Sequence, residues 1–367
     1  MQADVVVVGG GPAGIASAIA ASLKGFRVTV VDSRTPPIDK PCGEGLLPEA
    51  VVSLRRLGIE LDSSLAFPFY GISFRDEDSC AVARIARGQA FGVRRTALHK
   101  MLVRRAQELG VCFLWGARVS GLEANHVHVN GRTVTYRWLI GADGQNSAVR
   151  SWTGLGVTRY RRSRFGFRRH YRVEPWTDVV EVHWGKHCQM FVTPTQADEI
   201  CVAVLSSDSG LRIERALERF PEVARHVKGA HAVMAEGGAV TALGRAGRVA
   251  RGNVALAGDA SCSIDGIAGQ GLSLAFQEAI ALGDALARGD LRVYEHAHRK
   301  IIKTALLMTE LLLLMDRSDW IRRKTLRLFA AQPALYSKMM SVHTGETAAY
   351  KLGVSDIVGL GLRVLTA

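Results

Sequence analysis

The sequence predicts an α/β protein, α+β overall, in which a doubly wound α/β layer contains an inserted antiparallel sheet and is followed by a helical carboxyl-terminal region. Three observations predict this arrangement. The chain begins with a strand, glycine turn, helix and strand, its middle contains short alternating runs, and near residue 254 it returns to a buried strand followed by helices. Its 367 residues are enough for about two domains.

Residues 4–32 have the pattern of a βαβ unit. A β-branched run at 5–8 precedes a glycine turn at 9–14, an Ala-rich helix at 15–24 and a second strand at 27–31. The unit has the expected length of about 30 residues. We therefore expect two parallel strands joined by a helix.

The same layer continues further along the chain. A helix rich in Leu and Arg at 96–109 precedes strands expected at 111–115, 127–129 and 133–140. The strand at 254–257 then leads into a helix of small residues. This alternation of helices and strands is typical of an α/β layer.

Between about residues 160 and 240 the pattern changes to short alternating runs, which indicates an inserted antiparallel sheet. The runs are 164–173, 179–183, 190–193 and 200–205. We expect three units: a discontinuous first domain of residues 1–70, 92–158 and 245–292, an inserted sheet domain of residues 71–91 and 159–244, and a helical region of residues 293–367.

Composition excludes several classes of protein. The net charge of +13 favours an anionic partner, but the basic residues are scattered and form neither an RNA-binding signature nor a zinc-finger spacing, so we expect no nucleic acid. The six cysteines form no disulfide framework, which fits a reducing compartment. No secretory signal and no run of about 20 apolar residues is evident, so we expect a cytoplasmic protein.

The first motif, Gly9-Gly10-Gly11-Pro12-Ala13-Gly14, lies between a strand and a helix, and Asp32 ends the second strand. Gly9 makes the tight turn, Gly11 lets the backbone approach a pyrophosphate, and Gly14 lets the helix pack closely on the strand. Asp32 is placed to accept hydrogen bonds from a ribose. An ordinary glycine-rich turn is the alternative, but the strand, helix and acidic residue together favour a dinucleotide.

Two later motifs favour FAD over NAD. Gly258-Asp259 ends a strand, and Gly269-Gln270-Gly271 opens the following helix, whose amino terminus suits an electron-rich flavin edge. Asp259 is placed to bind a polyol hydroxyl. Asp143-Gly144, followed by Ser147 and Arg150, ends another strand in the same way.

The ordered set GxGxxG, GADGxxSxVR and GDA(x)nGxGL resembles the flavoprotein superfamily of aromatic hydroxylases, flavin halogenases and geranylgeranyl reductases, which share the fold of p-hydroxybenzoate hydroxylase. The resemblance covers nearly the whole chain. It implies a Rossmann-type FAD-binding domain with an inserted substrate-binding sheet, and FAD as the cofactor. The predicted FAD-binding positions are Gly9, Gly11, Pro12, Ala13, Gly14, Asp32, Ser33, Arg34, Cys42, Gly43, Arg95, Val119, Asp143, Gly144, Gly258, Asp259, Gly269, Gly271 and Leu272.

Within that superfamily, the segment Lys40 to Pro48, with its Pro-Cys-Gly sequence, is similar to the geranylgeranyl reductase branch. The stretch from Ser263 to Gly271 is similar too, although Gly266 stands where relatives usually carry proline. The WxWxIP motif of flavin halogenases is absent, which disfavours halogenation.

Candidate catalytic residues are Cys42 and His170, and candidate substrate-binding residues are Arg168, His170 and Tyr171. Alternation along a strand places Arg168 and His170 on one face and Tyr171 on the other. A packed thiol and a solvated sheet face are the alternatives for these residues. The chain offers His183, His187 and Cys188 without metal-ligand spacing, so we expect no metal.

The preferred function is an NAD(P)H-dependent FAD monooxygenase that hydroxylates an aromatic or polyketide-like lipophilic substrate. The alternative is a geranylgeranyl-reductase-like enzyme that reduces isoprenoid double bonds. An alternative of another class is a flavin-binding electron-transfer partner at a membrane. The apolar run at 305–315, flanked by basic residues, is consistent with a core helix or with peripheral contact to anionic lipid.

Overall fold

The first domain is built on a mainly parallel sheet of eight strands. The computed structural model describes residues 2–160 and 163–347 of the chain. The strand order is β20-β21-β11-β1-β2-β8, with the β9–β10 hairpin attached to β11. The bounds are β1 Gln2–Val8, β2 Val28–Asp32, β8 Cys112–Trp115, β9 Val119–Glu123, β10 His126–Val129, β11 Arg132–Gly141, β20 Ala250–Arg251 and β21 Val254–Leu256.

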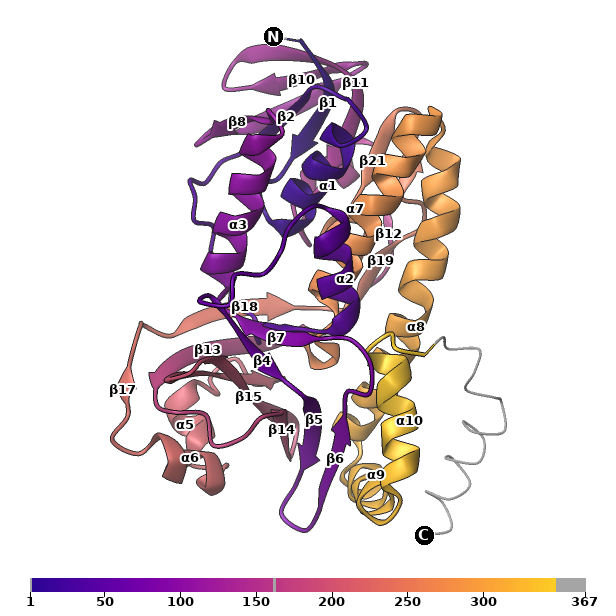
Figure 1. Cartoon of the computed structure of the whole chain (residues 1–367). Helices are drawn as coiled ribbons and strands as arrows, with labels where there is room; N and C mark the ends of the chain where they lie inside the picture. Colours follow the sequence, from indigo (N-terminus) through magenta and orange to yellow (C-terminus); the bar gives the residue numbers. More distant parts are fainter. Residues whose placement is uncertain (1, 161–162, 348–367) are drawn as a thin grey trace.

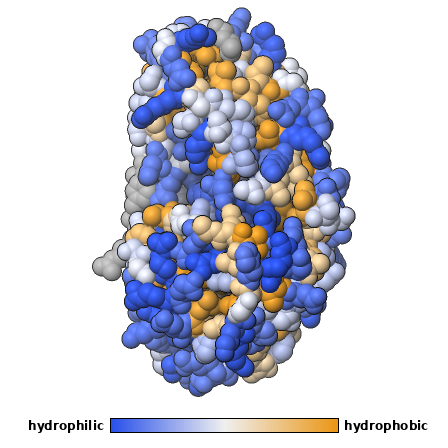
Figure 2. All heavy atoms as spheres, turned by 90° about the vertical axis from the view of Figure 1, so that its left-hand side faces the viewer, coloured by the Kyte–Doolittle hydropathy of each residue, from blue (hydrophilic) through white to orange (hydrophobic). Residues whose placement is uncertain are grey.

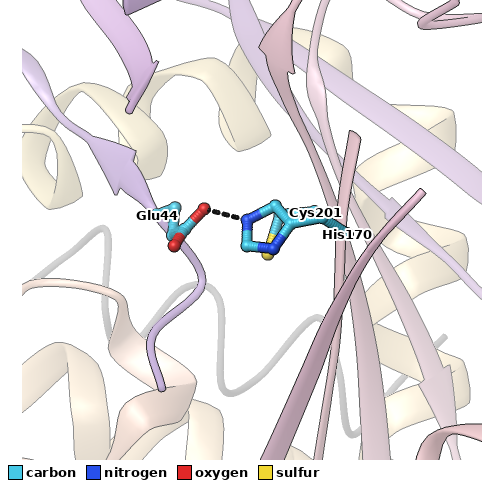
Figure 3. Close-up of side chains that lie close together, drawn as sticks. All are labelled: Glu44, His170 and Cys201. Atoms are coloured by element: carbon cyan, nitrogen blue, oxygen red, sulfur yellow. Dashed lines mark hydrogen bonds and ion pairs between the residues drawn. The ribbon is translucent and has the colours of Figure 1, made fainter. Parts of the chain in front are cut away.

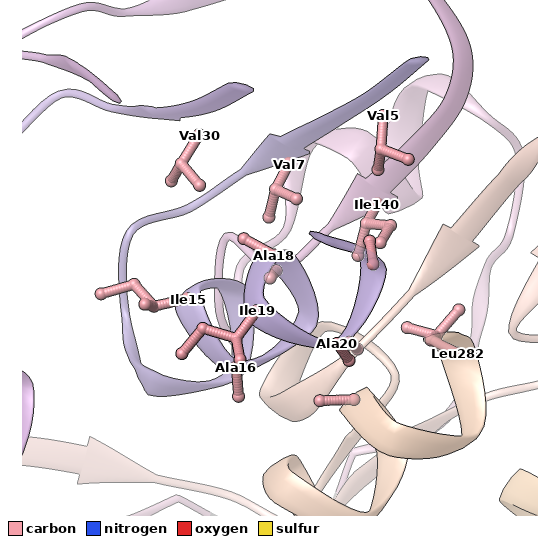
Figure 4. Packing of buried hydrophobic residues seen from close by; sticks show 14 of the residues in the cluster. Val5, Val7, Ile15, Ala16, Ala18, Ile19, Ala20, Val30, Ile140 and Leu282 are labelled. Atoms are coloured by element: carbon pink, nitrogen blue, oxygen red, sulfur yellow. The ribbon is translucent and has the colours of Figure 1, made fainter. Parts of the chain in front are cut away.

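Helices cover this sheet and close its core (Figure 1). Apolar residues of α1, among them Ile15 and Ile19, pack against Val5 and Val7 of β1 and against Leu282 of α7 (Figure 4). The predicted βαβ unit is thus confirmed as β1, α1 and β2. The helices of this layer are α1 Pro12–Ser22, α2 Pro48–Arg56, α3 Arg95–Glu108, α4 Ala148–Trp152 and α7 Gly271–Arg288.

The inserted sheet also contains eight strands and is mainly antiparallel, as predicted. Its order is β17-β13-β16-β15-β14-β5-β6, and β18 pairs with β13. The β5–β14 pair is parallel, which joins the earlier hairpin to the later strands. The bounds are β5 Gly71–Arg75, β6 Cys80–Arg84, β13 Arg164–Arg172, β14 Val180–Gly185, β15 Cys188–Gln196, β16 Glu199–Ser206, β17 His231–Ala232 and β18 Gly237–Thr241.

Two small sheets connect the larger parts. One orders its strands β3-β7-β4 and the other β12-β19-β22. Their bounds are β3 Gly45–Leu46, β4 Ala66–Phe69, β7 Ala90–Val93, β12 Val157–Tyr160, β19 Gly244–Ala246 and β22 Cys262–Ser263. Short helices complete this part: α5 Ile213–Leu217, α6 Pro221–Val227, and the 3-10 turns η1 Gly258–Ala260 and η2 Gly266–Ala268.

The carboxyl-terminal region is helical, as predicted, through α8 Leu291–Arg317, α9 Asp319–Ala331 and α10 Pro333–His343. These helices pack against the β5–β6 side of the inserted sheet (Figure 1). The end of the predicted helical region, residues 348–367, lies outside the described residues. Within the described part of the chain, each helix is too short or too polar to cross a membrane.

The outer face of the inserted sheet is covered by α5 and α6, which form a separate apolar cluster with β13, β15 and β16. Figure 2 views the molecule from the left-hand side of Figure 1, and on that face hydrophilic residues predominate while hydrophobic residues form scattered groups. The fold class predicted from the sequence is confirmed, whereas the residue limits of the three predicted units stay a prediction.

The junction between β7 and β15 predicts a stability effect that depends on one missing side chain. A Cβ at Gly92 would lie 1.7 Å from the carbonyl oxygen of Pro194, whereas a Cβ at its register partner Gly45 would meet nothing closer than 3.9 Å. Gly92→Ala should therefore lower the free energy of unfolding by about 1–3 kcal/mol, as in other overpacked sites. Gly45→Ala is the matched control, and equal effects of the two changes in urea denaturation would contradict this account.

Candidate active site

Three segments that are far apart in the sequence converge on one cavity of about 880 Å³. They are the glycine turn between β1 and α1, the loop at Asp143 after β11, and the segment from Gly258 to Leu272. Of the positions predicted to bind FAD, all except Gly14 line this cavity. The role of each position at the cofactor stays a prediction.

The glycine turn is built for close backbone approaches. Gly9 has a φ of 113°, and a Cβ there would lie 2.3 Å from the carbonyl oxygen of Ala142. A Cβ at Gly14 would lie 1.8 Å from the carbonyl oxygen of Gly9, so Gly14 permits helix packing and does not line the cavity. A Cβ at Gly11 would meet no protein atom within 4 Å. Gly11 thus leaves open space where a pyrophosphate would approach.

Acidic residues at the strand ends have defined partners. Asp32 accepts hydrogen bonds from the amides of Gly10, at 2.7 Å, and Arg34, at 2.8 Å. Asp143 accepts from the backbone of α4 and from the Ser147 hydroxyl, so its carboxylate also caps that helix. Asp259 forms an ion pair with Lys40 at 2.6 Å. All three carboxylates lie at the cavity where a ribose or polyol would be bound.

Arg95 supplies a positive charge to the same cavity. It is the first residue of α3, and its Nε is buried with no hydrogen-bond partner in the described part of the structure. An orphaned guanidinium nitrogen beside an open glycine turn fits an anionic phosphate group. The residues present therefore fit FAD at the pyrophosphate.

Glu44 forms the centre of a buried polar cluster that the sequence did not single out. Its carboxylate accepts from the Arg95 amide at 3.0 Å and from the Arg168 guanidinium at 2.6 Å, and it is hydrogen-bonded to His170 Nε2 (Figure 3). Glu44 is 1% exposed and has a φ of 60°. Arg168 also donates to Asp39 at 2.6 Å.

The structure brings Arg168 and Glu44 to the cavity wall, whereas His170 lies behind them. His170 is fully buried, is not among the lining residues, and reaches the site through Glu44. Tyr171 lies on the opposite face of β13, in the apolar cluster with α5 and α6. The predicted alternation is confirmed, and for that reason Tyr171 is not placed at the cavity where the substrate-binding prediction put it.

Cys42 lines the cavity beside this cluster, and its Sγ accepts from the Glu44 amide at 3.3 Å. Burial raises the pKa of the Cys42 thiol, with the Arg95 charge opposing the shift. The thiol is therefore neutral near pH 7. Burial also raises the pKa of Cys201 well above its usual value.

One group of described residues has metal-ligating side chains close together. The ligand atoms of Glu44, His170 and Cys201 lie within 4.8 Å of one another (Figure 3). The Glu44 carboxylate already accepts a hydrogen bond from the Arg168 guanidinium, and burial keeps the Cys201 thiol neutral. We interpret the group as a hydrogen-bonded cluster, and the absence of a metal stays a prediction.

The far end of the cavity is an apolar chamber between the inserted sheet and the carboxyl-terminal helices. We use this name for Ile72, Phe74, Val180, Val182, Phe191, Leu312 and Met340, all of which line the cavity. No sequence motif marks these residues, because they come from β5, β14, β15, α8 and α10 and meet only in the folded chain.

His343, at the end of α10, lines the same cavity. It is 6% exposed, and its ring is hydrogen-bonded to the Ala268 backbone. Burial lowers the pKa of His343 to about 4. The imidazole is therefore neutral at physiological pH.

Comparison with known proteins decides the family. A family model described as an FAD binding domain matches residues 2–305. The chain belongs to this FAD-binding family. It is an FAD-dependent oxidoreductase, and the predicted superfamily and cofactor are confirmed.

Two relatives match most of the chain. A menaquinone reductase of Mycolicibacterium smegmatis is 30% identical over 343 residues, covering 81% of this chain and 79% of that protein. A rifampicin monooxygenase of Rhodococcus hoagii is 26% identical over 356 residues, covering 82% of this chain and 68% of that protein. The crystal structure of a flavoprotein/dehydrogenase from Cytophaga hutchinsonii has the same fold, with a TM-score of 0.85, 18% identity and coverage of 99% and 98%.

Gly11 and Gly14 of the glycine turn give a matched pair of variants. A Cβ at Gly11 meets no protein atom within 4 Å, so Gly11→Val should fold but weaken FAD binding by about a hundredfold or more, or about 3 kcal/mol. Gly14→Val should instead lose the fold, because its Cβ meets the Gly9 carbonyl. Flavin absorbance and circular dichroism report the two effects. A Gly11→Val protein with stoichiometric FAD would contradict the assignment.

His343 predicts a pH-dependent stability. The unfolded chain gains a proton on this imidazole as the pH falls below 6.5, whereas the folded chain does so only near pH 4. The unfolded state therefore binds more protons in this window, and stability falls as the pH falls, by up to about 3 kcal/mol. His343→Gln should flatten the profile by that amount in urea denaturation at several pH values. If the free energies of unfolding of wild type and variant differ by the same amount at every pH, the prediction is contradicted.

Proposed function

We propose that this oxidoreductase is an NAD(P)H-dependent monooxygenase that hydroxylates a lipophilic aromatic substrate. The observation that supports this most directly is the apolar chamber, which belongs to the same cavity as the cofactor-binding residues. Oxygen transfer from a flavin requires that water be kept from the reacting atoms. A chamber walled by Phe74, Phe191 and Leu312 meets this requirement and suits an aromatic or aliphatic substrate.

The balanced reaction is substrate C–H plus O₂, NAD(P)H and a proton, which gives substrate C–OH, water and NAD(P)⁺. Bound FAD supplies the redox chemistry that passes electrons from the nicotinamide to oxygen. In this proposal Arg95 and the glycine turn hold the pyrophosphate, and the neutral Cys42 thiol donates a proton at Sγ. Glu44 contacts the cavity directly, and His170 acts through it as a positioning residue.

The relation to a rifampicin monooxygenase supports this reaction, since that protein's name describes an oxygenase and most of its length matches. At 26% identity, we base the choice of substrate on the cavity and not on this relative. The sequence contains no second dinucleotide motif. We therefore propose that NAD(P)H would bind at the same cavity, without a separate domain of its own.

A second candidate is a reductase of isoprenoid double bonds. The specific observation in its favour is that Cys42, in the Pro-Cys-Gly segment shared with geranylgeranyl reductases, is a buried neutral thiol in the cavity. The relation to a menaquinone reductase over 79% of its length also supports it. In this reaction hydride and a proton add across a double bond, so that alkene, NAD(P)H and a proton give alkane and NAD(P)⁺.

Peripheral contact with anionic lipid stays a proposal that would serve either substrate. Lys303, Arg317 and Arg323 are exposed on α8 and α9, and Leu314 and Trp320 of the same two helices are exposed as well. Basic residues beside exposed apolar side chains are typical of membrane-surface helices. The alternative of a pure electron-transfer partner is disfavoured, because the apolar chamber belongs to the same cavity as the predicted cofactor residues.

One experiment separates the two reactions. FAD-loaded protein is supplied with NADPH or NADH and either an alkylphenol under oxygen-18 gas or a polyprenyl quinone without oxygen. We expect the alkylphenol product to carry one oxygen-18 atom, as detected by mass spectrometry. Saturation of a side-chain double bond of the quinone under anaerobic conditions, with no labelled phenol product, would replace the monooxygenase proposal by the reductase. Gly11→Val, which should lack FAD, is the control for uncatalysed oxidation.

A further inference from the structure

Two buried polar side chains at one point of the cavity wall each have an atom without a partner. Gln270 and His343 are 5% and 6% exposed and both line the cavity. The Gln270 side-chain nitrogen donates to the backbone carbonyl of His343, which holds the two residues together. In the described part of the chain, Gln270 Oε1 and His343 Nδ1 have no hydrogen-bond partner.

Both orphaned atoms can accept a hydrogen bond. Burial keeps the His343 ring neutral, and a neutral imidazole has one nitrogen that donates and one that accepts, so Nδ1 accepts when the hydrogen is on Nε2. The Gln270 amide is oriented by its own donor bond, which leaves Oε1 as its free acceptor.

Buried acceptors without partners are rare in folded proteins, because leaving them unpaired costs free energy. Two of them on adjacent residues of a ligand cavity indicate a group that a ligand supplies. That group must be a hydrogen-bond donor. The neighbouring chamber residues Leu312 and Met340 are apolar and favour a neutral donor, such as a hydroxyl, over a cation.

We propose that Gln270 and His343 form a subsite that receives the hydroxyl hydrogen of a phenolic head group whose apolar chain occupies the chamber. The inference rests on the proposed function for its substrate, which it narrows from any lipophilic aromatic to a hydroxylated one. Gln270 lies at the start of α7 and His343 at the end of α10, so the subsite joins these two helices. It therefore fixes the aromatic head at the flavin end of the chamber.

The test uses FAD-loaded protein and two probes, 4-heptylphenol and its methyl ether 4-heptylanisole. The ether has the same chain and ring but no hydrogen to donate. Binding is measured by calorimetry and by the change in the visible absorbance of the bound flavin. We expect the phenol to bind about tenfold more tightly than the ether, the effect typical of one hydrogen bond to a buried acceptor.

Variants assign that preference to the subsite. His343→Phe and Gln270→Met each remove an acceptor and should bring the affinity ratio close to one, whereas His343→Asn, whose amide oxygen can take the place of Nδ1, should recover part of it. Met339→Leu changes an apolar residue of the same helix that does not line the cavity, and it is the control for the ratio.

Several outcomes overturn the proposal. Equal binding of both probes by the wild type, binding of neither, or a tenfold ratio that survives in His343→Phe and Gln270→Met would each do so. Loss of FAD from both acceptor variants, with FAD retained in Met339→Leu, would show that the cofactor uses these acceptors and would overturn the proposal. The ratio of the two affinities does not depend on turnover. If no oxygen-18 is incorporated but the ratio is about ten in the wild type and close to one in the acceptor variants, the monooxygenase proposal is wrong and the proposed subsite is supported.

Discussion

The carboxylate of Glu44 is the interaction on which the active-site geometry depends. It is an anion removed from water, and three donors from two parts of the fold compensate it: the Arg95 amide at the start of α3, and the Arg168 and His170 side chains of β13. Removing one donor from such a buried group is costly, because the remaining charge stays unpaired. Glu44 therefore joins α3 of the first domain to β13 of the inserted sheet, and these contacts hold its own backbone in the left-handed region.

The same contact fixes the neighbouring Pro-Cys-Gly segment. Cys42 accepts from the Glu44 amide, and Lys40 and Asp39 form ion pairs with Asp259 and Arg168 on opposite sides of the cavity. A segment held at several points presents its thiol in one orientation. The Cys42 thiol and the apolar chamber line the same cavity, so one scaffold suits either of the two candidate reactions.

The sequence predicts the parts of the site that depend on short spacing. The glycine turn, the strand end at Asp143 and the strand end at Asp259 are local patterns, and the structure brings all three to one cavity. The alternation of β13 is a local pattern as well. It does not predict the chamber, because Phe74 and Leu312 meet only through long-range packing. Glu44 belongs to the Pro-Cys-Gly segment of residues 40–48, but its place in the buried cluster depends on Arg168, which is more than a hundred residues away in the sequence. Tyr171 was placed at the substrate by its neighbours in sequence, although strand geometry turns it away.

The cavity is walled at one side by the first helix of the chain and at the other by α10, the last that the structure describes. During synthesis on the ribosome, the glycine turn emerges long before Met340 and His343 exist to complete the wall. A nascent chain can fold β1, α1 and β2 early, but at that stage the cavity lacks the part of its wall that α10 contributes. The complete wall around the cavity therefore exists only after α10 has been synthesised and has packed against the rest of the fold.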